Sequence, residues 1–388
     1  MALDYHSLIN NSTELFSEDA INRLFGEYAE RHVSTVQWRV SALGKLLYHS
    51  NLGDRFTATP FTADNIPGFA AIHRPIYDKC AAIMAKIDPL EVAIRLARKH
   101  GLTLYPWLTI YDDAGYHPFT WSELIRNHPE YCWKEFNSDV YFHGITSYVY
   151  PEVVEHRLNQ IRELLSYGID GIHLCTRTHS RPPGYIEKYL DFLREHKANE
   201  WKSTDTACSL VAMYEQCRNR FGFDPPAVKA YQEKTGRTPE PDDLEWWKFR
   251  GGYLLDFLRQ VRVLTKEKNG DLSFGVRADF SMYPKTFFDW KRMLDENIIT
   301  ELHYGASNGF LDAYGARQEC PELFLSPGRK SYFRIVNPNV AVEEHIKLFE
   351  ANGNSQFMER FDGITAFEAV HFVTHPELWD FITHLRNC

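Results

Sequence analysis

The sequence predicts a single (β/α)₈ TIM barrel, an α/β fold in which eight parallel strands alternate with helices, with long βα loops and an insertion after the fourth strand and helix. Short runs rich in β-branched and aromatic residues alternate with amphipathic helical patterns, and eight such runs can be counted. The chain has 388 residues, of which 44% are hydrophobic, which suits one barrel with a sizeable core. We therefore predict one barrel over residues 1–388.

The first half of the chain supplies four of the predicted strands, at residues 2–10, 34–42, 102–111 and 169–177. The helices between them have recognisable ends, because Ser17 is placed to cap one helix, Gly101 to end another and Pro151 to begin a third. Long loops, from Gly44 to Pro75 and again before Pro151, separate these elements. Loops of this length in a barrel usually shape a site.

The second half supplies the other four strands, at residues 271–280, 298–306, 330–337 and 362–372. Residues 197–245 fit neither a strand nor a regular crossover helix, and they carry the Pro- and Gly-containing runs FGFDPP and GRTPEPDD. We interpret 197–245 as an insertion within the barrel that walls its pocket.

Charge and cysteine usage narrow the class of protein. The net charge of -9 has no long single-sign runs, so a nucleic-acid partner is not expected. The first residues lack the basic region and the apolar run of a signal peptide, and no stretch reaches eighteen consecutive apolar residues. We therefore expect no membrane partner and a cytoplasmic location. Seven cysteines without a CxxC pair predict reduced thiols and no zinc knuckle, and we predict no cofactor. The oligomeric state stays open.

Strand alternation sorts polar side chains onto the inward faces of the strands. In the fifth strand, for example, Arg277 and Asp279 share the face opposite Phe274 and Val276. The same sorting selects Asp4, His6, Arg39, Trp107, Tyr111, Asp113, His173, Arg177, Glu301, His303, Arg334 and Glu368. Because a purely structural barrel favours Val, Ile and Leu there, this pattern predicts a polar pocket at the C-terminal ends of the strands.

Two carboxyl groups in such a pocket would permit glycosidic cleavage, one as acid and the other as nucleophile or base. The predicted catalytic residues are Asp113, Asp279, Glu301 and Glu368. The sequence does not give the separation of the carboxyl groups, which decides between retention and inversion. The predicted substrate-binding residues are Asp4, His6, Arg39, Trp107, Tyr111, His173, Arg177, Arg277, His303 and Arg334. Trp107 and Tyr111 could stack on sugar rings. Four arginines suit carboxylate or sulfate groups, so we expect an anionic glycan.

Four segments, in this order and spacing, resemble the glycoside-hydrolase-like family ten proteins, which are related in fold to the poly-N-acetylglucosamine hydrolase domain. They are DPLEVAIRLARKHGLTLYPWLTIYDD, YPEVVEHRLNQIRELLSYGIDGIHL, FRGGYLLDFLRQVRVLTKEKNGDLSFGV and DGITAFEAV. The resemblance spans nearly the whole chain and implies a barrel that hydrolyses carbohydrate. Relatives often carry an acidic residue after DGI in strand four, where this chain has Cys175. The resemblance therefore implies that Asp113 or Asp279 supplies the acid, or that the chemistry differs.

Other interpretations of the same residues stay open. The string GASNG fits a nucleophile elbow, with Ser307 as nucleophile and His371 as base. His6, His173 and His303 could hold a metal ion, although satisfied histidines are commoner. Cys175 could be a nucleophile, although a packed thiol is commoner. Inward charges could form buried ion pairs, and the barrel could bind a glycan without cleaving it.

Overall fold

The computed structural model describes residues 1–3, 17–42, 44–56, 69–114, 120–176, 180, 182–185, 187–188, 191, 220–268, 270–277, 289–305, 330–335, 343, 362–366 and 369–387. Eight parallel strands form its main sheet, and they follow one another in sequence order. They are β1 (Ala2–Leu3), β2 (Thr35–Arg39), β5 (Thr103–Thr109), β8 (Gly171–Cys175), β9 (Asp271–Arg277), β10 (Glu301–Gly305), β11 (Lys330–Ile335) and β12 (Gly363–Ala366). The eight predicted strands are confirmed, with shorter bounds.

Contacts across the sheet show that it curls into a barrel. Gln37 Nε2 on β2 lies 3.2 Å from His303 Nδ1 on β10. Three strands separate β2 from β10 in the order of the sheet. In a flat sheet strands four steps apart would lie about 19 Å from each other, at about 4.8 Å per step. The chain therefore folds as a (β/α)₈ barrel. Among the described residues, no hydrogen-bonded ladder joins β12 to β1.

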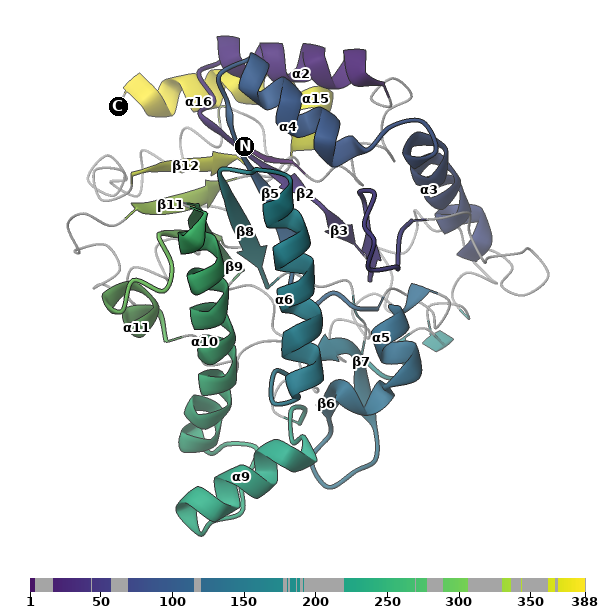
Figure 1. The fold of residues 1–388 in the computed structure, drawn as a ribbon, viewed down its shortest axis with the longest axis vertical. Helices are drawn as coiled ribbons and strands as arrows, with labels where there is room; N and C mark the ends of the chain where they lie inside the picture. The colour runs from purple at the N-terminus through teal and green to yellow at the C-terminus, as the bar shows by residue number, and fades with distance from the viewer. Residues whose placement is uncertain are drawn as a thin grey trace.

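Helices connect the strands and surround them (Figure 1). They are α2 (Glu18–Glu30), α3 (Phe69–Met84), α4 (Pro89–Lys99), α6 (Pro151–Ser166), α10 (Leu244–Glu267), α11 (Trp290–Asp295), α15 (Ala369–Thr374) and α16 (Leu378–Asn387). Their ends follow local rules: Ser17 accepts a hydrogen bond from the Ala20 amide, and Gly101 follows α4 with a φ of 68°. No helix in this described part of the chain is long and apolar enough to cross a membrane.

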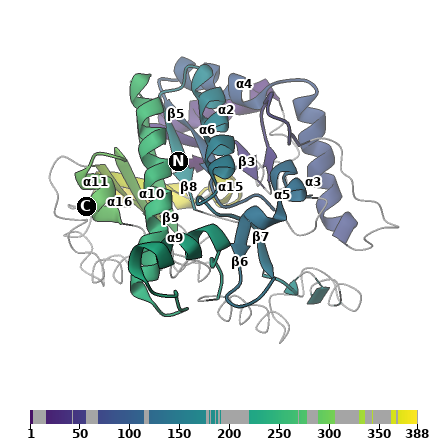
Figure 2. The same ribbon diagram turned by 60° about the horizontal axis from the view of Figure 1, so that its bottom comes forward.

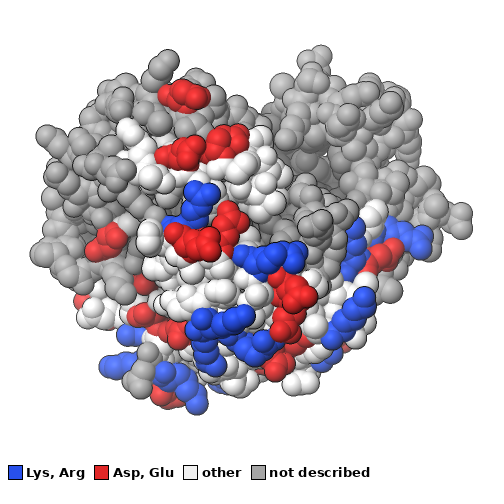
Figure 3. Space-filling view, turned by 90° about the horizontal axis from the view of Figure 1, so that it is seen from above, with Lys and Arg blue, Asp and Glu red and all other residues white. Residues whose placement is uncertain are grey.

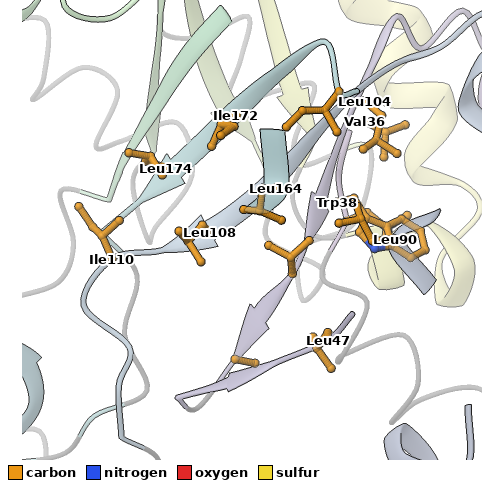
Figure 4. Close-up of a cluster of buried hydrophobic side chains, with 14 of the residues drawn as sticks. Val36, Trp38, Leu47, Leu90, Leu104, Leu108, Ile110, Leu164, Ile172 and Leu174 are labelled. Atoms are coloured by element: carbon orange, nitrogen blue, oxygen red, sulfur yellow. The ribbon is translucent and has the colours of Figure 1, made fainter. Parts of the chain in front are cut away.

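The outward faces of the strands make the main core with the helices (Figure 4). The side chains labelled there include Val36, Trp38, Leu104, Leu108, Ile172 and Leu174 on strands, with Leu90 on α4 and Leu164 on α6. All are buried. Complete burial of one such aliphatic side chain stabilises the fold by about 1.5–3 kcal/mol. The core therefore fixes which strand residues face the barrel interior.

Small elements follow β2 and β5. They are β3 (Ser41–Ala42), β4 (Lys45–Leu46), α5 (Glu123–Asn127), the 3₁₀ turn Pro129–Tyr131, β6 (Cys132–Lys134) and β7 (Tyr141–Thr146). β3 belongs to the predicted strand 34–42, and the others occupy stretches that the sequence predicts as loops. The strands β3, β4 and β6 have only two or three residues, which is too short to show a period in sequence. The last predicted strand is also too long, because α15 begins at Ala369. Buried Ala369, Val370 and Phe372 fit helical spacing as well as a strand.

The described part of the predicted insertion packs against β6 and β7, at the end of the molecule toward which β5 and β8 point (Figures 1 and 2). It contains α9 (Pro225–Thr235). The Gly222 amide donates to the Lys134 carbonyl (2.8 Å), and the Lys134 amide donates to Asp224 Oδ1 (2.9 Å). Residues 197–219 lie outside the described residues. Seen from the end where α2 and α4 lie, basic and acidic side chains are interspersed (Figure 3).

Candidate active site

The inward faces of the strands carry polar side chains, as the alternation predicts. Gln37, Arg39, Thr109, His173, Ser273, Glu301, His303 and Thr365 are all less than 7% exposed. Neighbouring strands hold one another through these groups. His173 Nδ1, for example, lies 2.8 Å from Ser273 Oγ, and the rings of His173 and His303 meet edge to face at 5.0 Å. The barrel interior is thus a hydrogen-bonded polar column.

Arg39 is the best-defined ionic group at the C-terminal end of this column. Its Nη2 lies 3.1 Å from Asp112 Oδ2, and both side chains are fully buried. Its Nε donates to the Ser41 carbonyl at 2.7 Å. The guanidinium also lies over the Trp107 ring, 5.4 Å from the ring centre. Arg39, predicted to bind substrate, is therefore part of a buried ion pair whose partner, Asp112, sequence reasoning missed.

Trp107 and Tyr111 do not form the predicted sugar-stacking surface. Trp107 has no exposed area and lies between Arg39 and His173, with Cys175 against it. Tyr111 is 2% exposed and packs between the rings of Trp133 and Tyr148, 5.7 and 5.6 Å away. The prediction fails because strand aromatics on a barrel are covered as readily from the inside as from the outside. Cys175 is buried too, as a packed thiol would be.

Asp113 is also part of a buried ion pair. It forms an ion pair with Arg157 of α6 and accepts a hydrogen bond from Thr146 Oγ1 at 3.0 Å. The two charged side chains are 3% and 4% exposed. Asp113 therefore joins the segment after β5 to α6 and β7, and the catalytic role predicted for it is not supported.

Glu301 lies at the wrong end of its strand for catalysis at the C-terminal ends, and His303 lies in the middle of that strand. Glu301 is the first residue of β10, and His303 follows two positions later. The Tyr105 hydroxyl lies 3.3 Å from Glu301 Oε1 and 2.9 Å from Asp271 Oδ2. Burial, with these two carboxylates, raises the pKa of Tyr105 far above its ordinary value, so the hydroxyl stays protonated as a donor. The C-terminal position predicted for Glu301 is thus corrected.

Several predicted site residues lie outside the described residues: Asp4, His6, Arg177, Asp279, Glu368 and also Ser307. Arg277 and Arg334 are described by their backbone only. The register pairs Gly305 of β10 with Arg277 on one side and Arg334 on the other. The two arginine positions therefore lie in one row, two strands apart, at the C-terminal ends. Within the described residues, no group of three His, Cys, Asp or Glu side chains could hold a metal ion.

A half-buried aromatic row, which the sequence does not predict, lies beside the C-terminal ends of β5 and β8. Trp121 stacks on His143 at 4.2 Å between ring centres, and Tyr141 lies 6.4 Å from His143 on the same strand, β7. The next residue, Gly144, packs so closely on Ala114 and Ser180 that a Cβ there would clash with both. These two residues follow β5 and β8, so the row borders the barrel mouth. Burial lowers the pKa of His143, which favours the neutral ring.

Comparisons with known proteins agree with this fold. No family model matches the sequence, and no curated protein matches it with significance. An alpha-L-fucosidase isoenzyme 2 from Paenibacillus thiaminolyticus is similar in structure (TM-score 0.51, 12% identity), with 99% of this chain and 48% of that chain covered. The catalytic domain of a beta-amylase from Paenibacillus polymyxa is also similar (TM-score 0.50, 9% identity), with 92% and 90% covered.

The chain spans about half the length of the fucosidase chain and most of the beta-amylase domain. Both of these proteins are named for enzymes that act on glycosides. At 9 and 12% identity the likeness shows the fold alone. The chain therefore has a barrel of the kind that glycoside hydrolases use, and membership of family ten stays a prediction.

Proposed function

We propose that the protein is a glycoside hydrolase whose catalytic groups lie at the C-terminal ends of the barrel strands. The observation that supports this most is the polar column inside a barrel whose structural neighbours are a fucosidase and a beta-amylase. Buried polar groups lower stability unless they are paired, and a barrel with no site would fill this space with aliphatic side chains. The column instead leads to a row of polar positions at the C-terminal ends.

Asp279 and Glu368 are the proposed catalytic carboxyl groups. Cleavage of a glycosidic bond needs a general acid and a second carboxylate. Of the four predicted candidates, Asp113 is paired with Arg157, and Glu301 begins β10. Asp279 follows Arg277, the last residue of β9, by two positions, and Glu368 follows Ala366, the last residue of β12, by two. Both carboxyl groups thus belong to segments that leave the C-terminal ends of strands.

The proposed substrate is a glycan that carries uronate or sulfate groups. Arg277 and Arg334 occupy one row of the sheet on either side of Gly305, which has no side chain, and Arg177 follows β8. Guanidinium groups pair well with carboxylate and sulfate. The aromatic row Trp121, His143 and Tyr141 is a better surface for a sugar ring than buried Trp107, because its members are partly exposed.

The test is to incubate the protein with matched neutral and uronate-containing oligosaccharides and to measure new reducing ends. Asp279→Asn and Glu368→Gln should each lower turnover by about a hundredfold or more while substrate affinity is retained. Asp256→Asn and Glu155→Gln, both on exposed faces of outer helices, are the matched controls and should keep full activity. Full turnover in both Asp279→Asn and Glu368→Gln would refute the assignment of these residues.

A glycan-binding barrel without hydrolytic activity is the second candidate. One observation favours it: Cys175, at the position where relatives often carry an acid, is buried against Trp107. A binding protein should hold acidic oligosaccharides and release no reducing ends, and Asp279→Asn and Glu368→Gln should leave its affinity unchanged. Equilibrium binding measured beside the reducing-end assay separates the two functions.

A further inference from the structure

The aromatic row leads away from the barrel mouth along one face of β7. Gly144, at the mouth, packs on Ala114 and Ser180, which follow β5 and β8. His143 precedes Gly144, and Tyr141 lies two residues further from the mouth on the same face of the strand, at about 3.3 Å of rise per residue. β6 and β7 lie beyond the end of the sheet toward which β5 and β8 point (Figures 1 and 2). A linear ligand that extends from the mouth along β7 therefore passes His143 before Tyr141.

Buried side chains support the aromatic row. Trp121 and Tyr141 pack against a small buried cluster that includes Ile125 of α5 and Cys132 of β6. His143 contacts both rings, at 4.2 Å from Trp121 and 6.4 Å from Tyr141 between ring centres. Each of the three rings nevertheless keeps part of its surface exposed. Contiguous exposed apolar surface beside a site marks a binding surface more often than scattered single side chains do.

The aromatic row is electrically neutral at neutral pH. Burial lowers the pKa of His143, which keeps the imidazole uncharged. Lys134 lies across the two-stranded sheet from Tyr141, with its Nζ 6.0 Å from the centre of that ring. This ammonium group is paired with the carboxylate of Asp139 at 2.8 Å. The row can therefore select a ligand by shape and apolar contact, and not by charge.

His143 adds one polar group to this apolar surface. Its Nδ1 is buried and has no hydrogen-bond partner among the described residues. Because Nδ1 is covered while the ring as a whole is half exposed, a ligand would reach the ring at Nε2. A neutral imidazole has one donor and one acceptor nitrogen, so Nε2 can hydrogen-bond to a hydroxyl group in either tautomer. Flat rings beside a single hydrogen-bonding nitrogen match a sugar, which has an apolar CH face and a rim of hydroxyl groups.

We propose that the aromatic row is a distal subsite, which holds the part of a glycan chain that extends from the barrel mouth along β7. This inference rests on the proposed function, since the mouth is where the chain would be cleaved. The CH faces of the sugar rings cover Trp121 and Tyr141, and a hydroxyl group hydrogen-bonds to His143 Nε2. The row holds neutral and uronate-containing chains equally, whereas Arg277 and Arg334 provide the selection for charge. A disaccharide bound at the mouth does not use the row.

Isothermal titration tests this proposal in a Glu368→Gln background, which slows hydrolysis. The ligands are cello-oligosaccharides and their uronate counterparts, each as disaccharide and hexasaccharide. Trp121→Leu and Tyr141→Leu keep an apolar side chain over the buried cluster and remove the flat ring. Each should weaken binding of both hexasaccharides by about three- to tenfold and leave the disaccharides unchanged. His143→Phe keeps a ring and loses the hydrogen bond, so a loss of the same size is expected.

Phe249→Leu on α10 is the matched control. Phe249 is likewise a half-buried ring, and it packs on Tyr231 of α9 and Tyr253 of α10, at 5.4 and 5.6 Å between ring centres. This variant should keep the affinity for all four ligands. Urea unfolding shows that each variant is folded. With Glu368 intact, the reducing-end assay should show a raised KM for the hexasaccharides and an unchanged kcat in the three row variants.

Several results would overturn the distal subsite. They are equal affinity for disaccharide and hexasaccharide when the row is intact, hexasaccharide binding that no row variant weakens, a loss confined to the uronate hexasaccharide, and no saturable binding at millimolar concentration. Release of reducing ends with an unchanged KM in all row variants overturns the subsite and leaves the hydrolase in place. Binding that depends on chain length and on the row, without release of reducing ends, supports the subsite and overturns the hydrolase.

Discussion

Replacing Asp113 by Asn tests whether this carboxylate holds the fold together or takes part in catalysis. Asparagine keeps the shape of the side chain and removes its charge, so Arg157 would be left as a buried cation without its counter-ion. Both side chains are nearly inaccessible, with 3% and 4% exposure. Breaking a buried pair by removing one partner costs about 3–5 kcal/mol. We expect Asp113→Asn to lower the free energy of unfolding by about this amount.

A double-mutant cycle separates the ion pair from other effects of the substitution. Arg157→Met removes the buried cation and retains the apolar length of the side chain, so the double variant should be less destabilised than Asp113→Asn alone. The exposed pair of Arg162 and Glu155 on the same helix is the control. Glu155→Gln should lower the unfolding free energy by far less, because exposed ion pairs contribute little.

Urea unfolding, followed by tryptophan fluorescence, measures these free energies, and the reducing-end assay is run on the same samples under native conditions. The structure predicts lost stability for Asp113→Asn and retained turnover at temperatures where the variant stays folded. Unchanged stability together with lost turnover would show that Asp113 is a catalytic group and that its ion pair with Arg157 does not stabilise the fold.

Two further perturbations follow from the same structure. Burial lowers the pKa of His143 in the native state below about 6.5, the value in unfolded chains. Burial also lowers the pKa of His156, and the charge of Arg157 acts in the same direction. The unfolded chain then binds more protons, so stability should fall as the pH drops from about 7.5 to 5.5. The double variant His143→Gln with His156→Gln should show a shallower slope in urea unfolding, and an equal slope would contradict the assignment. Gly222→Ala should destabilise, because φ is 97° and a Cβ would displace the Arg250 guanidinium, which packs over the Trp133 ring 4.5 Å from its centre. Gly236→Ala, with φ of 70° and no neighbour within 4 Å, should cost only about 1 kcal/mol in the same measurement.

The number, order and inward faces of the strands could be predicted from the sequence. These features depend on local periodicity, because a side chain in a strand alternates between two faces whatever its distant neighbours are. Arg39, His173 and His303 accordingly lie on the predicted inward faces. Helix ends at Ser17 and Gly101 were equally predictable, since capping involves residues next to one another in the chain.

The depth of each residue along its strand could not be predicted as well. Alternation identifies a face and carries no information about where a strand begins. Alternation therefore predicts Glu301 at the C-terminal rim, although Glu301 is the first residue of β10. The aromatic row was missed for a related reason: Trp121 and His143 come from a stretch with no clear period, and only the packing of β7 on the barrel brings their rings together.

The sequence alone thus determined the barrel and its polar interior, because both follow from patterns that repeat within a few residues. Only the tertiary structure decided which charges neutralise one another, since Asp113 and its partner Arg157 are 44 positions apart. It also decided that Glu301 and Thr365 share an N-terminal pocket with Gln37. Those residues belong to strands far apart in the chain, and curling of the sheet is what brings them to one cavity.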